Sequence, residues 1–318
     1  MSWVFLTDRH AYKLKKPVRY AFLDYSTLEA RRRTCEVEVR LNRRLAGEVY
    51  CGITPLTLSD VGELRLGGTG EVVDWLVKMR RLPECLMLDH VIAAQTVNKT
   101  DVHRVGVVLA GFYRSAWPVP MTGADYRRRL TEEIHSNSNE LKRPEFQLST
   151  ESIDALAATL LKFLSQRPEM FDRRIREERI VEAHGDLRPE HICLGPQPVI
   201  IDCLEFNRSL RILDAASEIA FLWLECERLG AADAGRMIFE TYRDTSGDWP
   251  PAHLMGFYKS FHAYTRAKIA VWHLDDIGTN HPAKWIERAN CYLRLAASNM
   301  MRGIASSSSA RRQISRIS

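Results

Sequence analysis

Residues 184–202, HGDLRPEHICLGPQPVIID, hold the densest cluster of polar side chains in the chain. Two short apolar runs flank the turn Gly195-Pro-Gln-Pro198, and this pattern predicts a β-hairpin. Such a hairpin brings His191 close to Asp202 at one strand end, with Asp186 in the loop beside them. Two carboxylates and an imidazole in one place suit a divalent cation and a group that orients a nucleophile.

Each aspartate also has a purely structural interpretation. Asp186 can be a turn residue, and Asp202 can cap a helix or loop by accepting backbone hydrogen bonds. Taken singly, each residue favours this structural interpretation. The joint pattern of the motif favours a catalytic one.

The joint pattern resembles the aminoglycoside phosphotransferase and choline kinase-like family, which shares the protein-kinase fold. That family carries His-Gly-Asp, an asparagine five residues after the aspartate, and Ile-Asp about ten residues further on. Here His184-Gly185-Asp186 and Ile201-Asp202 match. The resemblance implies an α+β, two-lobed protein-kinase-like fold, with a small β-rich N-lobe and a larger helical C-lobe. An uncharacterised bacterial branch is the most similar, through Tyr12-Lys-Leu-Lys-Lys-Pro17 and Cys203-Leu-Glu-Phe-Asn207.

The resemblance also implies a role for each matching residue. Asp186 is expected to be catalytic and to orient the substrate hydroxyl in line with the γ-phosphate. Asp202 is expected to bind Mg²⁺, a hard cation that prefers carboxylate oxygen. His184 is expected to hold the loop by hydrogen bonds, and Asp214 resembles the later aspartate that braces this loop.

One position departs from the family pattern. His191 stands where the family has its second metal-binding asparagine. Imidazole is a softer and bulkier ligand than an amide oxygen, so either His191 binds the metal, with a preference for Mn²⁺ over Mg²⁺, or the second metal site is weak. Glu205 either compensates for the change or forms a surface salt bridge.

The first part of the chain contains candidates for phosphate binding. Kinase-like folds hold the nucleotide phosphates with a strand lysine that pairs with a helix glutamate. Ala11-Tyr-Lys13 resembles the Ala-x-Lys of that strand, and alternation places Lys15 on the same face as a rival. Glu38 lies on the apolar face of the following helix and is the better partner for Lys13, whereas Glu36 faces outward with two arginines.

The resemblance leaves part of the phosphate site without a counterpart. A strand and a phosphate-covering loop usually precede the strand equivalent to residues 3–6, which implies a reduced lid unless residues 7–10 serve as one. The chain contains no GxxxxGK[ST] motif, so a P-loop kinase is excluded. Residues 75–83 are expected to be the strand and hinge that bind the adenine edge of ATP.

The pattern of apolar residues predicts the domain organisation. Residues 1–82 read as a nucleotide-binding N-lobe, with strands at 3–6 and 11–16 and a long helix opened by the capping box Ser26-Thr-Leu-Glu29. Residues 83–304 read as a helical C-lobe that holds the catalytic loop and the metal-binding hairpin, with Trp223, Trp272 and Trp285 in its core. Residues 305–318 read as a disordered tail.

Composition limits the class of protein. Hydrophobic residues make up 45% and charged residues 27% of the 318 residues, which is typical of a globular protein. The seven cysteines are scattered without a CxxC pair, and no apolar run is long enough to span a membrane, so a reduced cytoplasmic protein is expected. The net charge of +5 comes partly from arginine-rich helix faces, so no nucleic-acid partner is expected.

Three functions are compatible with these residues. The first is an ATP-dependent kinase that transfers the γ-phosphate to a hydroxyl of a small substrate. The second is a nucleotide-binding pseudokinase without turnover, suggested by the reduced lid and by His191. The third is a metal-dependent phosphohydrolase in which His184, Asp186, His191 and Asp202 hold a transition metal.

Overall fold

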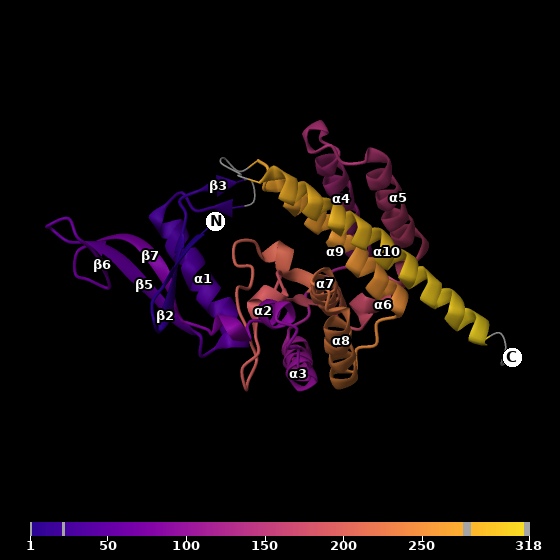
Figure 1. Ribbon diagram of the computed structural model, residues 1–318, viewed down its shortest axis with the longest axis horizontal. Helices are drawn as coiled ribbons and strands as arrows, with labels where there is room; N and C mark the ends of the chain where they lie inside the picture. The colour runs from indigo at the N-terminus through magenta and orange to yellow at the C-terminus, as the bar shows by residue number, and fades with distance from the viewer. Residues whose placement is uncertain (1, 21–22, 276–280, 315–318) are drawn as a thin grey trace. The chain divides into compact units, whose positions relative to one another are not determined.

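The computed structural model describes residues 2–20, 23–275 and 281–314 (Figure 1). The chain divides into two compact units. The first unit comprises Met1–Phe112 and His184–Ile212, and the second comprises Tyr113–Ala183 and Leu213–Ser318. This division is based on compactness and does not test the predicted lobe boundary after residue 82. That boundary stays a prediction.

A five-stranded antiparallel sheet forms the base of the first unit. Its strands lie in the order β1 (Ser2–Leu6), β2 (His10–Lys15), β7 (Glu71–Arg80), β5 (Tyr50–Leu58) and β6 (Leu64–Leu66). The two strands predicted at 3–6 and 11–16 are present as β1 and β2, which pair antiparallel and are joined by a tight turn in which the Thr7 N–H donates to the His10 carbonyl at 2.8 Å. β2 lies between β1 and β7 and is therefore a central strand of the sheet, not an edge strand.

Helix α1 (Leu28–Ala46) packs on β5 and β7, as Figure 1 shows. The apolar residues of this contact form one buried cluster: Cys35, Val39, Ala46, Val49, Tyr50, Val77 and Met79. The predicted capping box is off by one residue. Thr27 is the N-cap, and its hydroxyl accepts from the Ala30 N–H at 3.1 Å, while the Ser26 hydroxyl donates to Asp24.

The remaining elements of the first unit are short. They are β3 (Arg19–Tyr20), β4 (Leu23–Asp24), the 3-10 helix η1 (Glu84–Leu86), α2 (Leu88–Ala93), the 3-10 helix η3 (Pro189–His191), β9 (Ile192–Cys193), β10 (Val199–Ile200) and the 3-10 helix η4 (Arg208–Arg211). Helix α3 (Lys99–Ser115) belongs to this unit as far as Phe112. The Leu194 N–H donates to the Leu86 carbonyl at 2.8 Å, which anchors the end of β9 beside η1.

The second unit is mainly helical. Its helices are α4 (Gly123–Leu141), the 3-10 helix η2 (Pro144–Phe146), α5 (Thr150–Gln166), α6 (Pro168–Arg176), α7 (Ala215–Arg228), α8 (Ala232–Ser246), α9 (Ala252–Trp272) and α10 (Pro282–Ile314), with short strands β8 (Ile180–Glu182) and β11 (Ile212–Asp214). Helix α10 lies along α9 (Figure 1) and runs into the segment 305–318 for which disorder is predicted. Residues 315–318 lie outside the described residues. None of the helices in the described ranges is both long and apolar enough to cross a membrane.

The three tryptophans predicted in the core lie at its edge instead. Trp272 is exposed, and Trp223 and Trp285 are half-buried. Trp223 stacks on Phe239, and its indole N–H donates to the Ala232 carbonyl at 3.1 Å. A large side chain with a polar N–H is often only partly buried, so helical spacing alone overestimates its burial.

Candidate functional site

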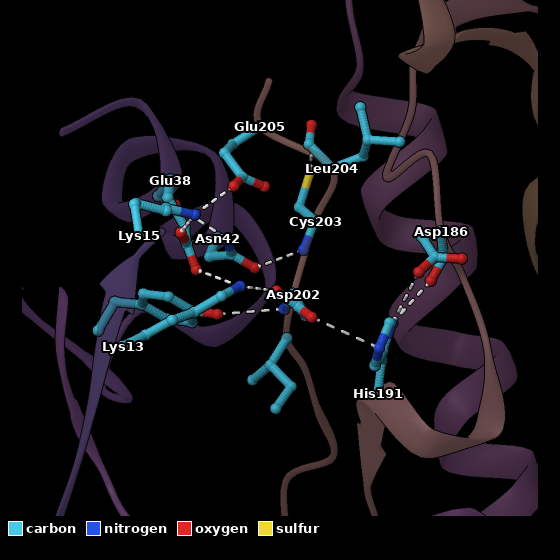
Figure 2. A network of polar contacts seen from close by, with 12 residues as sticks. Lys13, Lys15, Glu38, Asn42, Asp186, His191, Asp202, Cys203, Leu204 and Glu205 are labelled. Carbon is cyan, nitrogen blue, oxygen red and sulfur yellow. Dashed lines mark hydrogen bonds and ion pairs between the residues drawn. The ribbon is translucent and has the colours of Figure 1, made fainter. Parts of the chain in front are cut away.

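The predicted β-hairpin is present and forms the frame of the site. β9 and β10 pair antiparallel, with Ile192 opposite Ile200. The Ile201 N–H donates to the His191 carbonyl at 2.9 Å, so the two chain segments continue side by side beyond the strands. This places the His191 Nε2 atom 3.6 Å from a carboxylate oxygen of Asp202, and its Nδ1 atom 3.8 Å from one of Asp186. The predicted convergence of these three residues is confirmed (Figure 2).

The hydrogen bonds of His191 assign its tautomer. Its Nδ1 atom lies 2.8 Å from the backbone carbonyl of Asp186 and therefore donates to it. Nε2 then carries a lone pair, which accepts from the Arg188 guanidinium at 3.1 Å and lies on the side of Asp202. A backbone carbonyl that fixes the opposite nitrogen is the usual support for a metal-binding histidine.

His184 has the structural role that was predicted for it. Its ring is fully buried, with Nε2 donating to the Ile201 carbonyl at 2.9 Å and Nδ1 accepting from the Asp186 N–H at 3.3 Å. Burial lowers the pKa of His184 to about 3. The neutral ring thus ties the backbone of Asp186 to the segment that leads to Asp202.

Asp186 has a partner that sequence reasoning missed. The Arg188 guanidinium lies 2.9 Å from its carboxylate, and the Asp186 side chain remains 29% exposed. A basic residue two positions after the aspartate was the only local signal of this ion pair. The Asp186 carboxylate is therefore partly exposed to solvent, and one of its neighbours, Arg188, is positively charged.

The predicted pair of Lys13 and Glu38 is present. The Lys13 Nζ atom lies 2.9 Å from a Glu38 carboxylate oxygen and also contacts Asp202. Burial disfavours the charged ammonium, but Glu38 and Asp202 outweigh this effect and raise the pKa of Lys13 well above its usual value. Glu38 is fully buried on α1, as expected for a carboxylate on the apolar face that has found a cation.

Lys15 is a second partner of Glu38 and not an alternative to Lys13. It is fully buried, and its ammonium contacts the carboxylates of Glu38 and Glu205 (Figure 2). Glu205 was expected either to compensate at the metal site or to form a surface salt bridge. Its side chain is 9% exposed, so the salt bridge that it forms is a buried one.

The backbone of Asp202 adopts a left-handed conformation, with φ of 62°. This conformation is uncommon outside glycine but tolerated by aspartate. The Asp202 N–H donates to the Tyr50 hydroxyl at 3.1 Å, and the next N–H, of Cys203, donates to the Asn42 side chain at 2.8 Å. Sequence reasoning missed Tyr50 and Asn42, because each lies about 150 or more residues away in the chain.

The Asp202 carboxylate is the exposed end of the site. Desolvation acts to raise the pKa of this carboxyl, but the charge of Lys13 and its hydrogen bond to Asp202 hold the pKa well below its usual value. The side chain is 41% exposed, so solvent screens part of this attraction. Asp202 is therefore an ionised carboxylate that can still reach a ligand.

The donor atoms of the site suit a metal that arrives with a phosphate ligand. Asp202 and the Nε2 atom of His191 offer two protein ligands, and within the described residues no group of three or more His, Cys, Asp or Glu side chains is placed to hold a metal. Mg²⁺ usually binds proteins through one or two carboxylates together with substrate phosphates and water. A structural or catalytic zinc site needs three or four protein ligands.

Asp214 lies in the second unit. Its carboxylate caps α7 by accepting from the Ala216 N–H at 2.9 Å, and it also binds the Arg174 guanidinium. Its predicted role as a brace for the catalytic loop stays a prediction.

Solved structures with similar folds are small-molecule kinases. A glucosamine kinase in complex with glucosamine, ADP and inorganic phosphate superposes with a TM-score of 0.50 at 13% identity, covering 92% of this chain and 79% of the kinase. A choline kinase from Cryptosporidium parvum gives a TM-score of 0.51 at 11% identity, with coverage of 94% and 83%. An ethanolamine kinase from Plasmodium vivax gives 0.50 at 11% identity, with coverage of 91% and 75%.

The chain has a kinase-like fold. The predicted α+β class, with a β-sheet N-lobe and a helical C-lobe, is confirmed by this likeness. At these identities the likeness concerns the fold alone.

Sequence comparison finds relatives but no matching family model. Uncharacterized proteins from Mycobacterium tuberculosis and Mycobacterium bovis are each 35% identical over 274 residues, which cover 84% of this chain and 52% of theirs. The chain thus spans about half the length of the curated relatives that it matches.

Proposed function

We propose that the protein is an ATP-dependent phosphotransferase that moves the γ-phosphate to a hydroxyl of a small substrate. One observation carries the proposal: Lys13, Asp202, His191 and Asp186 form one continuous row of contacts, from a lysine paired with a buried glutamate to a solvent-facing carboxylate. Phosphoryl transfer uses a cation for the phosphates, ligands for a metal and a group that orients the attacking alcohol, and this row offers a candidate for each. The likeness of the fold to small-molecule kinases supports the same reaction class.

Lys13 and Glu38 are proposed to serve the nucleotide. The ammonium of Lys13 carries a full charge, because its carboxylate neighbours raise its pKa. A phosphate oxygen can replace Asp202 as one of its partners, while Glu38 continues to hold the stem in place. Glu38 is thus proposed to position the lysine, and Lys13 to bind the phosphates.

Asp202 and His191 are proposed to hold Mg²⁺ or Mn²⁺. The cation would neutralise charge on the phosphate oxygens and bind them to the protein. Asp202 offers an exposed anionic oxygen, and His191 offers a nitrogen whose orientation is fixed by the Asp186 carbonyl. Because imidazole is softer than an amide, we expect Mn²⁺ to bind relatively better here than at a site with asparagine.

Asp186 is proposed to orient the acceptor alcohol and to accept its proton. Its carboxylate is partly exposed, and its backbone N–H is held by the neutral ring of His184. The Arg188 guanidinium must release or share the carboxylate when the alcohol arrives. The acceptor is proposed to be a small hydroxylated molecule, and the glucosamine, choline and ethanolamine kinases of similar fold act on molecules of that size.

The experiment that tests this proposal is a thermal-shift titration with ATP and either Mg²⁺ or Mn²⁺ on the wild type and on Asp202→Ala. Ligand at about 100 times its dissociation constant stabilises a protein by about 2.7 kcal/mol, which moves the midpoint by several degrees. We expect a metal-dependent shift in the wild type that is lost in the variant. Absence of a shift with both metals would overturn the proposal, and a shift would be followed by a screen of alcohols for phosphate transfer.

The ion pair between Arg188 and Asp186 favours a second candidate, a nucleotide-binding module without turnover. An arginine on the carboxylate lowers its ability to accept a proton. Binding of Mg-ATP with no transfer to any alcohol in the screen would identify this candidate, and transfer that appears in Arg188→Ala would show that the ion pair is the cause. The phosphohydrolase is disfavoured, because His184 is fully buried and backbone groups hold both of its ring nitrogens. The Nε2 partner of His191 is instead the Arg188 side chain, which a metal can displace.

A further inference from the structure

The second lysine of β2 has no role in the proposed chemistry, yet it is the more deeply buried of the two. Lys15 has no exposed side-chain surface, whereas Lys13 is 14% exposed. A fully buried ammonium is costly unless carboxylates surround it. Lys15 meets this requirement with Glu38 on one side and Glu205 on the other.

The two lysines share one partner and differ in the other. Both contact Glu38, but Lys13 joins it to Asp202, at the exposed end of the site, and Lys15 joins it to Glu205, in the interior (Figure 2). The Tyr25 hydroxyl donates to Glu205 at 3.0 Å, and the Lys15 ammonium lies 5.6 Å from the centre of the Tyr25 ring. Lys15 therefore has partners that a bound nucleotide would not displace.

The charges of this cluster explain why two lysines are needed. Two ammonium groups face the three carboxylates of Glu38, Asp202 and Glu205. When Lys13 turns toward a phosphate, Glu38 would be left buried with a weakened partner if Lys15 were absent. With Lys15 in place, Glu38 keeps a cation throughout.

We propose that Lys15 and Glu205 act as positioning residues that hold residues 202–205 against β2 and α1 before any nucleotide binds, so that Lys13 can exchange Asp202 for a phosphate. This inference rests on the proposed function for the role of Lys13, but the tether itself does not depend on it. Lys15 connects β2, α1 and the segment after Asp202 through one atom, because Glu38 lies on α1 and Glu205 lies three residues after Asp202.

The backbone of this segment provides a direct readout of the tether. The N–H groups of Asp202, Cys203 and Leu204 all donate within the first unit, to the Tyr50 hydroxyl, the Asn42 side chain and the His184 carbonyl. Hydrogen exchange at Asp202 and Cys203 requires the segment to leave Tyr50 and Asn42, whereas the bond from Leu204 to His184 can survive this detachment. The exchange rates of Asp202 and Cys203 therefore report whether Lys15 or Lys13 holds the segment.

The first experiment compares hydrogen exchange of Asp202 and Cys203 in the ligand-free full chain of the wild type, Lys15→Met and Lys13→Met. We expect exchange at least tenfold faster in Lys15→Met and less than threefold faster in Lys13→Met. A peptide from α9 serves as the folding control and should be unchanged. Equal effects of the two lysine substitutions, or no effect of Lys15→Met, would overturn the inference.

Glu205→Gln is the milder variant, because the amide can still accept from the Tyr25 hydroxyl. It should also raise the exchange of Asp202 and Cys203 at least tenfold while leaving the α9 peptide unchanged. This variant keeps the test decisive if Lys15→Met does not fold. Exchange in Glu205→Gln at the wild-type rate would count against the tether.

The second experiment separates positioning from a general loss of stability. Dissociation constants for Mg-ATP and for adenosine are measured on the wild type and Glu205→Gln by calorimetry. We expect Mg-ATP to bind at least tenfold more weakly to the variant and adenosine to bind within twofold, because only phosphate and metal use Lys13 and Asp202. Equal weakening of both ligands would contradict a positioning role. If the wild type binds no Mg-ATP, the proposed function fails, and the exchange experiment alone decides the tether.

Discussion

Each unit of the molecule contains a buried ionic network, and the two networks differ in where they end. In the second unit, Arg174 binds both Asp214 and Asp248, and all three side chains are buried. The hydroxyls of Tyr258 and Tyr242 donate to these two carboxylates at 2.8 and 2.7 Å. We call this network closed because its short contacts all lie in the interior. Two longer ion pairs, from Arg174 to Glu177 and from Asp248 to Arg179 at 3.8 Å each, reach partly exposed side chains.

The network in the first unit is buried at one end only. Lys15 and Glu38 are as inaccessible as Arg174, but the row of contacts continues through Lys13 to Asp202, whose side chain is 41% exposed. A closed network can only stabilise the fold, whereas an open one presents fixed charges to a ligand. The comparison teaches that burial of a charged group is a poor guide to function, and that the exposed end of its network is a better one.

The largest effect on stability is expected at the centre of the closed network. Arg174→Met leaves Asp214 and Asp248 buried without their cation, which should lower the free energy of unfolding by about 3–5 kcal/mol. Urea denaturation measures this change. Arg173→Met is the matched control, because Arg173 is exposed and forms an ion pair with Glu177, the C-cap of α6; it should cost less than about 1 kcal/mol. Similar costs for the two variants would remove the basis of the comparison.

A smaller change in the free energy of unfolding is expected when the pH is lowered. It comes from His184, which lies beside the open network. Burial lowers the pKa of His184 to about 3, whereas an unfolded histidine titrates near 6.5. Between these values the unfolded chain binds more protons, so stability falls as the pH is lowered. The histidine should account for a loss of about 2 kcal/mol between pH 8 and pH 5.

Urea denaturation at both pH values, on the wild type and His184→Asn, checks this contribution. The variant should lose about 2 kcal/mol of the pH dependence whatever its stability at pH 8. Burial also lowers the pKa of His262, in the second unit, to about 4, and His262→Asn should change the dependence in the same direction. An unaltered pH dependence in His184→Asn would contradict the assignment of a neutral buried ring.

A further loss of stability is expected when Gly185 is substituted in the loop that carries Asp186. Gly185 has a φ of 89°, and a Cβ atom there would lie 2.9 Å from the Arg211 side chain and 3.0 Å from that of Leu204. Gly185→Ala should therefore cost about 1–2 kcal/mol. Gly195→Ala, in the hairpin turn, is the control and should stay within about 0.5 kcal/mol, because the nearest atom lies 3.6 Å away. Equal stability of the two variants in urea denaturation would show that the loop is not rigidly held.

The smallest effect on stability is expected at the exposed end of the open network. Asp202→Asn keeps a residue that tolerates φ of 62°, and Lys13 keeps Glu38, so the cost should be less than about 1 kcal/mol. The same variant should abolish the metal-dependent shift produced by ATP. A cost close to that of Arg174→Met would show that Asp202 serves the fold and would break the distinction between the two networks.

Local sequence patterns predicted the parts of the site that are formed by residues near one another in the chain. The hairpin with His191 and Asp202 at its base follows from two apolar runs around a Gly-Pro turn. Alternation along β2 placed Lys13 and Lys15 on one face, and helical spacing placed Glu38 on the apolar face of α1. These predictions succeeded because strand and helix periods are properties of the local backbone.

The same local reasoning failed to predict the exposure of one tryptophan and the exact N-cap of α1. Helical spacing placed Trp272 in the core, but the structure leaves it exposed. The capping box at Ser26 is displaced to Thr27, because the hydroxyl of Ser26 is engaged by Asp24. Several residues satisfy such patterns equally well in sequence, and only packing selects one.

The sequence by itself determined which kinds of side chain lie at the hairpin, on β2 and on α1, and hence the chemistry that they can perform. Only the tertiary structure decided that Glu38 serves both lysines, that Glu205 is buried against Lys15, and that Tyr50 and Asn42 hold the backbone after Asp202. These partners lie from 23 to 190 residues apart in the chain. No local period relates such positions, because they meet only when the sheet, the helix and the hairpin pack together and the buried charges must find partners.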